Sequence, residues 1–332
     1  MISHLPRTPL AHLPTPLEPM PRLAAALGGP RLFIKRDDQT GLAAGGNKTR
    51  KLEFLVGEAL AQDADCLLTA GAVQSNHCRQ SAAAAAKHGL RCVLVLRGAP
   101  PAEVTGNLLL DELLGAEIVW AGDRPREDVL AEATEAQRAA GRKPYAFPIG
   151  GSTPLGAMGY VLAMEEALGQ ARMLGVNFDR MVFASSSGGT HAGLVAGAGQ
   201  FGYAGQVLGI SIDEDEGWLR ETVARLATGA ADLLGAPRAY TPSEINANSN
   251  YLGAGYAVLG PPEREAMRLF AETEGILLDP VYTGRAAAGL IDLIRRGEIG
   301  REETVLFWHT GGTPATFAYA DELRRSGGEA RP

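Results

Sequence analysis

The residues with the strongest chemical signal lie in one short stretch, Gly45-Gly46-Asn47-Lys48-Thr49-Arg50-Lys51. Its two glycines allow a tight turn and a close approach of the backbone to a ligand. Asn47 is a good N-cap, so the residues from Lys48 onward predict the start of a helix. Three cations in a first helical turn lie where the helix dipole disfavours positive charge. This arrangement suggests a bound anion and one lysine with a lowered pKa, as a Schiff-base lysine requires. A solvated basic helix start is the alternative that spacing leaves open.

A second candidate site is Ser185-Ser186-Ser187-Gly188-Gly189-Thr190, between a predicted strand and a predicted helix. Its hydroxyls and its glycine-rich backbone amides suit an oxyanion bound at a helix N-terminus. The stretch is not a Walker A loop, because no Gly-Lys-Ser/Thr follows, and it lacks the GxGxxG of a dinucleotide site. A tight strand–helix turn without a ligand is the alternative.

A third strand–loop–helix junction runs from Ala70 to His77. Ligands bind at the carboxyl ends of strands in open parallel sheets. Ser75 and Asn76 offer a hydroxyl, an amide and backbone N–H groups to a small carboxylate, although helix capping by Ser75 is the simpler explanation. His77 is either a general base or a neighbour of the cap, and we favour a supporting role for it. No pair of histidines has metal-ligand spacing with a carboxylate, so no metal site is predicted.

Two tyrosines and a threonine complete the candidate residues. Tyr256 and Tyr282 lie in glycine-rich turns, where a hydroxyl can orient a substrate or move a proton, and burial for packing is the alternative. Thr310 ends the last predicted strand, again at a carboxyl edge.

The elements that must position these residues alternate along the chain. Apolar runs of strand length alternate with Ala-rich runs of helix length, which predicts an α/β fold with a parallel sheet and covering helices. The predicted strands are 30–36, 66–72, 92–96, 118–121, 145–148, 181–184, 207–212 and 304–308. The predicted helices are 21–27, 49–62, 76–88, 106–114, 127–140, 157–174, 216–234, 263–274 and 286–296, with others starting at His191 and near Pro314.

The predicted domain boundary lies near residues 150–153, after which the chain returns to the sheet begun by residues 31–36. We therefore expect a large domain of residues 1–50 and 151–332 and a small domain of residues 51–150. Residues 236–260 are expected to be a loop.

Composition excludes several classes of protein. The chain has 332 residues, 45% of them hydrophobic, and a net charge of -7, which argues against nucleic acid as a partner. No apolar run reaches membrane-spanning length, and the N-terminus lacks a signal-peptide pattern. Three cysteines without a CxxC predict neither a disulfide framework nor a zinc site. We expect a soluble cytoplasmic protein.

Taken together, these stretches resemble the pyridoxal-phosphate enzymes of fold type II, in the family of aminocyclopropane-carboxylate deaminase and D-cysteine desulfhydrase. The resemblance implies the tryptophan synthase β-like fold, with two open, twisted, mostly parallel sheets. The matching stretches span nearly the whole chain: 35–38, 45–53, 74–77, 187–193, 279–284 and 309–312.

The resemblance also implies a role for each candidate residue. Lys48 would bind pyridoxal 5'-phosphate as a Schiff base and act as a base once the substrate displaces it. The phosphate would lie against Ser187, Gly188, Gly189 and Thr190, with help from Lys51. The substrate carboxylate would meet Ser75, Asn76 and His77, and Asn76 would also meet the 3'-oxygen of the cofactor. Tyr256 and Tyr282 would flank the reacting carbon, and Thr310 would face the pyridine nitrogen.

Two positions favour one branch of this family. The deaminase pattern has a glutamate and a leucine where this chain has Thr283 and Thr310. A neutral hydroxyl at the pyridine nitrogen makes a weaker electron sink, which suits elimination of a good leaving group. We predict a lyase that acts on D-cysteine. L-cysteate is the second choice, because residues 11–20 resemble L-cysteate sulfo-lyases, and 1-aminocyclopropane-1-carboxylate is a weaker third.

The partners expected are a small amino-acid substrate and a second copy in a homodimer. A non-catalytic binding protein and a nucleotide-binding enzyme are the rival classes.

Overall fold

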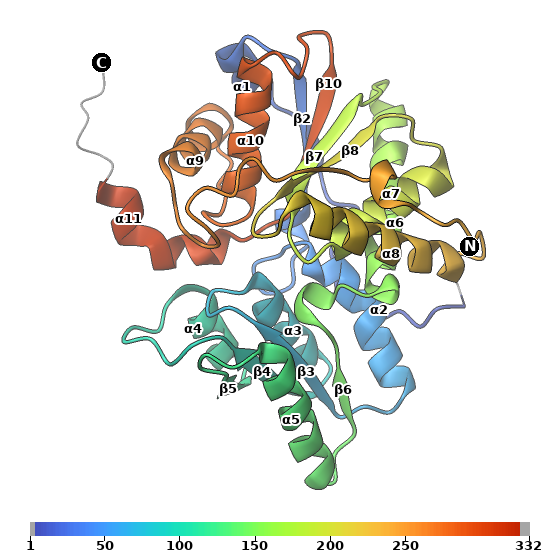
Figure 1. Cartoon of the computed structure of the whole chain (residues 1–332), viewed down its shortest axis with the longest axis vertical. Helices are drawn as coiled ribbons and strands as arrows, with labels where there is room; N and C mark the ends of the chain where they lie inside the picture. Colours follow the sequence, from blue (N-terminus) through green and yellow to red (C-terminus); the bar gives the residue numbers. More distant parts are fainter. Residues whose placement is uncertain (1–3, 326–332) are drawn as a thin grey trace.

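The computed structural model describes residues 4–325 as two sheets that form the two halves of the molecule (Figure 1). The strands are β1 (Leu17–Pro19), β2 (Arg31–Arg36), β3 (Cys66–Gly71), β4 (Arg91–Leu96), β5 (Glu117–Trp120), β6 (Pro144–Ala146), β7 (Arg180–Ser185), β8 (Gln206–Ser211), β9 (Asn246–Asn248) and β10 (Thr304–His309). The α-helices are α1 (Pro21–Leu27), α2 (Lys48–Ala61), α3 (Asn76–Lys87), α4 (Gly106–Leu113), α5 (Arg126–Ala139), α6 (Pro154–Leu174), α7 (Gly189–Phe201), α8 (Glu216–Leu233), α9 (Pro261–Glu274), α10 (Thr283–Arg295) and α11 (Ala320–Arg325). Short 3-10 helices are η1 (Asp37–Gln39), η2 (Ile149–Gly151), η3 (Pro242–Glu244) and η4 (Thr313–Tyr319).

The larger sheet has the order β1-β2-β10-β7-β8-β9. Its strands pair in parallel, except that β1 is antiparallel to β2. Both faces are covered by helices, so its strands are apolar on both sides, as parallel sheets require. Val305 and Phe307 of β10 pack in the core with α9 and α10, whereas Leu306 and Trp308 pack on the opposite face with α6 and α7.

The smaller sheet has the order β5-β4-β3-β6 and is entirely parallel. Its core against α2 and α3 contains Leu52, Leu55, Leu67 and Leu94. These strands and helices come from one continuous part of the chain, whereas β2 pairs with β10 across most of the sequence. The predicted α/β class with two mostly parallel sheets is confirmed, and the division into domains at residues 50 and 150 stays a prediction.

The structure corrects several predicted boundaries. Strands β1 and β9 were not expected, because an edge strand of three residues carries too short an apolar pattern to detect. Helix α6 begins at Pro154, before the predicted residue 157, because Thr153 caps it by accepting a hydrogen bond from the Gly156 amide. Helix α10 begins at Thr283 rather than at Ala286, because the Asp279 carboxylate accepts the Thr283 amide.

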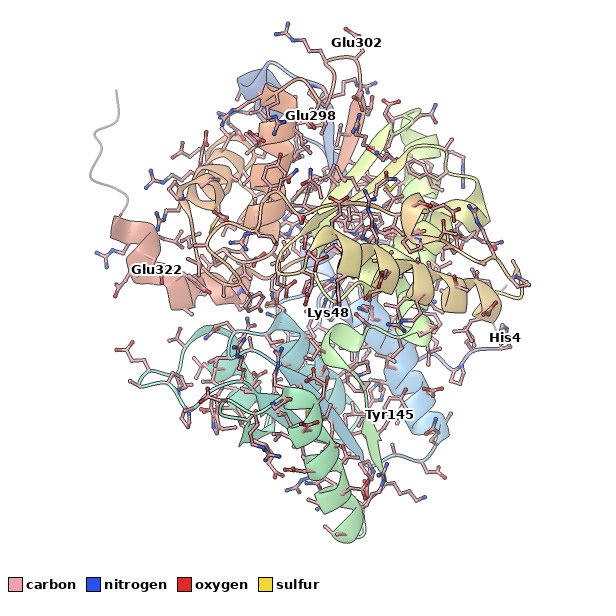
Figure 2. All side chains as sticks on the ribbon, viewed as in Figure 1. His4, Lys48, Tyr145, Glu298, Glu302 and Glu322 are labelled. Atoms are coloured by element: carbon pink, nitrogen blue, oxygen red, sulfur yellow. The ribbon has the colours of Figure 1, made fainter. Side chains whose placement is uncertain are left out.

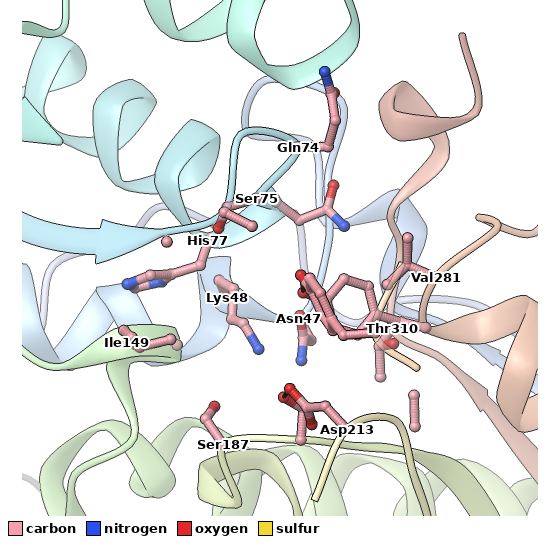
Figure 3. Close-up of a pocket in the computed structure, with 18 of the residues that line it drawn as sticks. Asn47, Lys48, Gln74, Ser75, His77, Ile149, Ser187, Asp213, Val281 and Thr310 are labelled. Carbon is pink, nitrogen blue, oxygen red and sulfur yellow. Dashed lines mark hydrogen bonds between the residues drawn. The ribbon is translucent and has the colours of Figure 1, made fainter. Parts of the chain in front are cut away.

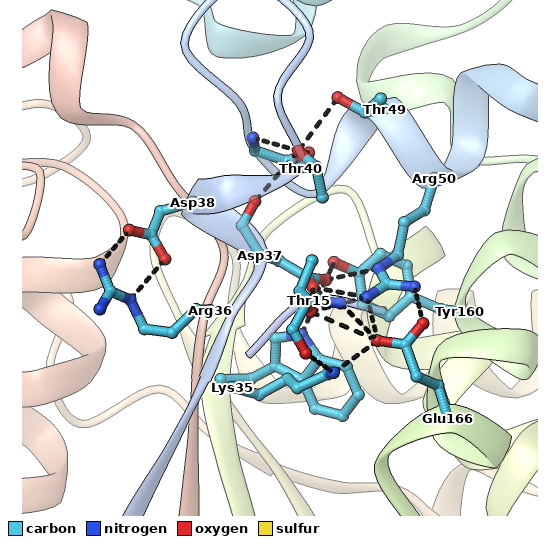
Figure 4. A network of polar contacts seen from close by, with 12 residues as sticks. Thr15, Lys35, Arg36, Asp37, Asp38, Thr40, Thr49, Arg50, Tyr160 and Glu166 are labelled. Carbon is cyan, nitrogen blue, oxygen red and sulfur yellow. Dashed lines mark hydrogen bonds and ion pairs between the residues drawn. The ribbon is translucent and has the colours of Figure 1, made fainter. Parts of the chain in front are cut away.

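A buried ion-pair network fixes α2 against the large sheet (Figure 4). Asp37 accepts two hydrogen bonds from Arg50, at 2.8 and 2.9 Å, and Glu166 pairs with both Arg50 and Lys35. Burial alone would raise the pKa of Asp37, but Arg50 outweighs it, and the pKa falls to about 2. Arg50 therefore has its counter-ions on the side of the large sheet. Of the three cations of the first turn that suggested a nearby bound anion, Arg50 is thus neutralised by carboxylates of the protein itself.

No helix within residues 4–325 is both long enough and apolar enough to cross a membrane. Across the same residues, no three histidine, cysteine or acidic side chains are grouped so that they would hold a metal ion. Cys66, Cys78 and Cys92 are buried thiols.

Candidate active site

A cavity of about 560 Å³ lies where the two halves meet. Its walls come from the carboxyl ends of strands in both sheets and from the first turns of α2, α3 and α7. Figure 2 places Lys48 at the middle of the molecule, between the two halves. All the candidate residues predicted from sequence line this cavity except Lys51, whose amine lies just behind the wall.

Lys48 is the first residue of α2, and its amine points toward Ser187 and Asp213 (Figure 3). Two unusual backbone conformations bring it there, since Gly45 and Gly46 have φ of 67° and 127°. A Cβ on Gly46 would lie 2.5 Å from the Gln80 side-chain nitrogen, and the φ of Gly46 is one that residues with a Cβ rarely adopt. Burial lowers the pKa of Lys48 to about 8, although Asp213 partly opposes the shift. The uncharged fraction of this amine near neutral pH is therefore far larger than for an ordinary lysine, and the uncharged form is the one that acts as nucleophile and base.

Asn47 does not cap α2, which corrects the prediction made from its residue type. Its side-chain amide donates to Thr190 Oγ1 at 3.0 Å, and its backbone amide donates to the Thr310 carbonyl at 2.9 Å. The Thr49 amide is instead accepted by Gln80 Oε1 of α3 at 2.8 Å. Asn47 thus ties the Lys48 loop to α7 and to the end of β10.

A group of hydrogen-bond donors, here called the cradle, lies at the N-terminus of α7 and contains Lys51, Ser152, Ser187 and Gly189. Gly188 has φ of 81°, and the Gly189 amide donates to Ser152 Oγ at 3.1 Å. Ser152 Oγ also accepts a hydrogen bond from Lys51 Nζ at 3.1 Å and lies 2.9 Å from Ser187 Oγ. A Cβ on Gly189 would lie 2.6 Å from Lys51 Nζ, so only glycine leaves the cradle open.

Lys51 supplies the amine of this cradle. It is 1% exposed, and no carboxylate within residues 4–325 forms an ion pair with it. Burial, followed by the nearby charge of Lys48, lowers the pKa of Lys51 well below its ordinary value. A buried lysine without a counter-ion, beside a helix N-terminus and two serine hydroxyls, fits a phosphate group. The donor set of this site therefore fits pyridoxal phosphate.

The first turn of α3 forms the opposite wall. Ser75 Oγ accepts the Cys78 amide at 3.2 Å, so Ser75 is a genuine helix cap as well as a cavity residue. Asn76 Oδ1 accepts hydrogen bonds from Arg79 at 2.8 Å and from Asn107 at 3.2 Å. Its oxygen is thereby occupied, and its NH2 group is the part left to donate to a ligand. The first amides of α3 also lack partners within the helix and suit a carboxylate.

His77 lies beside this wall and turns its ring toward the small sheet. Its Nε2 lies 2.8 Å from Thr69 Oγ1, and its ring meets Phe147 edge-on. Burial, followed by Lys48 and Lys51, lowers the pKa of His77 well below its ordinary value. The imidazole is therefore neutral at physiological pH, and its Nδ1 has no partner among the described residues.

Tyr256 and Tyr282 meet across the cavity, with 2.6 Å between their hydroxyl oxygens. Burial raises the pKa of Tyr256 to about 12 and that of Tyr282 well above its ordinary value. Both phenols are therefore protonated and can donate.

Thr310 lies at the end of β10 and lines the cavity, whereas Thr283 does not line it. The Thr283 hydroxyl instead bonds to Asp279 Oδ1 at 2.6 Å and closes the turn that carries Tyr282.

Sequence reasoning missed several cavity or cradle residues, among them Ser152, Asp213 and Tyr319. Ser152 follows a Gly-Gly pair that was interpreted only as a domain boundary. Asp213 directly follows β8, so the rule that ligands bind at the carboxyl ends of strands could have found it. Tyr319 of η4 carried no signal, because its side chain reaches the cavity only through tertiary packing.

Comparison with known proteins defines the class. The family described as Pyridoxal-phosphate dependent enzyme matches residues 8–311. The chain therefore belongs to this family, and it is a pyridoxal-phosphate dependent lyase of fold type II. The predicted cofactor and the predicted enzyme class are both confirmed.

Its similar relatives carry two names. The 1-aminocyclopropane-1-carboxylate deaminase of Burkholderia vietnamiensis (strain G4 / LMG 22486) is 42% identical over 97% of this chain and 99% of its own length. The D-cysteine desulfhydrase of Klebsiella pneumoniae (strain 342) is 44% identical over 97% of this chain and 98% of its own. A solved structure described as an ACC deaminase homologue is 39% identical, covers 98% of this chain and 97% of its own, and superposes with a TM-score of 0.90. The relatives support a pyridoxal-phosphate dependent elimination or deamination.

Proposed function

We propose that this enzyme eliminates the β-substituent of a β-substituted alanine, with D-cysteine as substrate and pyruvate, sulfide and ammonia as products. The observation that supports it is the position of Lys48, between the cradle at the start of α7, the first turn of α3 and a pair of protonated phenols. Bound pyridoxal phosphate supplies an electron sink for the negative charge left when the substrate loses its α-proton.

Three groups would hold the ligands in place. The Ser187–Thr190 loop would bind the cofactor phosphate, together with Lys51 acting beside Ser152. Ser75 would hold the substrate carboxylate, together with Asn76 and the first amides of α3. Thr310 would place its hydroxyl at the pyridine nitrogen, because it ends β10 at the cavity wall.

Two groups would move protons. The Lys48 amine, with its pKa lowered to about 8, would take the α-proton of the substrate. Tyr282 would donate its hydroxyl proton to the departing sulfur, because burial keeps this phenol protonated. Tyr256 would hold the Tyr282 hydroxyl in position through their 2.6 Å contact.

The choice among substrates rests on the cavity wall. Thr310 lines the cavity where the deaminase pattern has a leucine, which favours elimination over opening of a cyclopropane ring. Thr283 contributes less to this choice than its identity suggested, since it faces Asp279 rather than the cavity. Arg97 and Arg126 also line the cavity, and two cations there make L-cysteate, with its anionic sulfonate, the second candidate.

The test compares substrates side by side with the purified holoenzyme. Pyruvate is measured from D-cysteine, L-cysteine, L-cysteate and D-serine, and 2-oxobutyrate from 1-aminocyclopropane-1-carboxylate. We expect sulfide and pyruvate from D-cysteine. Dominant sulfite release from L-cysteate would keep the residue roles and replace the substrate. Dominant 2-oxobutyrate would show that Thr310 does not decide the reaction.

A homodimer in the cytoplasm is part of the same proposal. Leu113 of α4 and Phe317 of the neighbouring η4 are 73% and 71% exposed, and exposed apolar side chains of this size favour a partner surface. Light scattering would give the mass in solution, and a monomer would refute the dimer.

A further inference from the structure

Arg285 of α10 is a buried arginine that connects parts of the chain far apart in sequence. It is 1% exposed, and its Nε donates to Glu263 Oε1 at 2.8 Å. Its two terminal nitrogens donate to three backbone carbonyls: Nη1 to Ile212 at 2.8 Å and Gly255 at 3.0 Å, and Nη2 to Val258 at 3.0 Å. The planar guanidinium can bind these acceptors at once, whereas a lysine ammonium at the same position cannot.

Two of these three carbonyls belong to residues that directly precede a cavity residue. Ile212 precedes Asp213, and Gly255 precedes Tyr256. Arg285 itself lies three residues after Tyr282, on the helix that begins beside it. One side chain therefore fixes the relative positions of Asp213, Tyr256 and Tyr282.

The segment that carries Tyr256 needs such an anchor. Ala257 has φ of 62°, a left-handed conformation that residues with a Cβ rarely adopt. The turn within the segment is held by long backbone contacts, from Gly255 to Leu252 at 3.2 Å and from Val258 to Gly255 at 3.4 Å. A second anchor is Tyr319, whose hydroxyl donates to the Ala257 carbonyl at 2.9 Å.

We propose that Arg285 is a positioning residue for the proton transfer made by the tyrosine pair. It acts by holding the strained Tyr256 segment so that the Tyr256 hydroxyl stays in hydrogen-bond contact with Tyr282. This inference rests on the proposed elimination, in which Tyr282 protonates the leaving group. Arg285 touches neither substrate nor cofactor in this role.

The first experiment is a double-mutant cycle with Arg285→Lys and Tyr256→Phe, using the β-substituted alanine that the wild type turns over. We expect Arg285→Lys to lower kcat about 10- to 100-fold with KM nearly unchanged. Because both changes act through one contact, the double variant should be no slower than the slower single variant. Losses that multiply would overturn the proposal.

Arg180→Lys is the matched control. Arg180 also donates hydrogen bonds to two side chains, Glu303 and Gln206. It begins β7, however, and so lies at the end of that strand that is away from the cavity. The Arg180→Lys variant should lower the unfolding midpoint in urea without lowering kcat. An equal loss of kcat in Arg180→Lys would mean that general destabilisation explains the effect.

Hydrogen exchange gives a readout that needs no substrate. Arg285→Lys should speed amide exchange in residues 252–258, and Arg180→Lys should not. Tyr319→Phe, which removes only the second anchor, should speed exchange in the same segment and serves if Arg285→Lys does not fold. Unchanged exchange in both variants would overturn the anchoring. A wild type inactive on every β-substituted alanine would instead overturn the proposed function.

Discussion

Replacing Gly189 by alanine should weaken cofactor binding while leaving the fold intact. Its new Cβ would lie 2.6 Å from both Lys51 Nζ and Ser152 Oγ and 2.9 Å from the backbone of Ser152. The flexible amine can move, but the Ser152 backbone cannot move without disturbing the loop after η2. Such overpacking costs about 2 kcal/mol. At 1.4 kcal/mol per tenfold, this cost weakens pyridoxal phosphate binding roughly 30-fold.

The assay is titration of the apoprotein with pyridoxal phosphate, followed by the absorbance of the bound cofactor. Gly169→Ala is the control, because a Cβ there meets nothing closer than an Arg172 nitrogen at 3.8 Å. The overpacking also lowers the stability of the apoprotein, so Gly189→Ala should unfold at a lower urea concentration than Gly169→Ala while still unfolding cooperatively. If Gly189→Ala binds the cofactor as tightly as wild type, the α7 cradle is not the phosphate site and the reasoning fails.

Three further predictions concern single groups. Tyr282→Phe should lower kcat about 100-fold, with cofactor absorbance unchanged, because it removes the proposed acid; unchanged turnover would remove that role. The rate at which apoprotein takes up pyridoxal phosphate should rise with pH and level off above about pH 8, because only the uncharged Lys48 amine reacts; a flat profile from pH 6 to 9 would contradict the lowered pKa. Asp37→Asn should cost about 3–5 kcal/mol in urea unfolding at pH 7, because it leaves the Arg50 charge buried with one counter-ion fewer. The wild-type pKa of Asp37 is lowered from 3.8 to about 2, so its stabilisation is present above pH 4 and is lost as pH falls toward 2. Glu132→Gln, at an exposed ion pair, should leave both the stability and its pH dependence unchanged.

The sequence by itself determined which residues are candidates for the active site and at which ends of helices and strands they lie. Glycine conformation, helix starts and strand ends are local properties, so Lys48 and the Ser187–Thr190 loop could be placed at the ends of elements without coordinates. Parallel topology then predicts that such ends gather at one edge of each sheet. The alternation of apolar and Ala-rich runs predicted a parallel sheet with covering helices, whereas the division into two sheets was implied by the family resemblance.

Only the tertiary structure decided which partner each of these side chains contacts. Arg50 and Lys51 are adjacent on α2, yet about 100° of rotation per residue sends one to Asp37 and the other to the cradle. Asn47 suited a helix cap by type, but its partner Thr190 lies 143 residues away, beyond any local pattern. The role of Arg285 likewise depends on carbonyls that folding brings together from distant segments. Every residue has a backbone carbonyl, so the sequence does not indicate which ones will accept a hydrogen bond from Arg285.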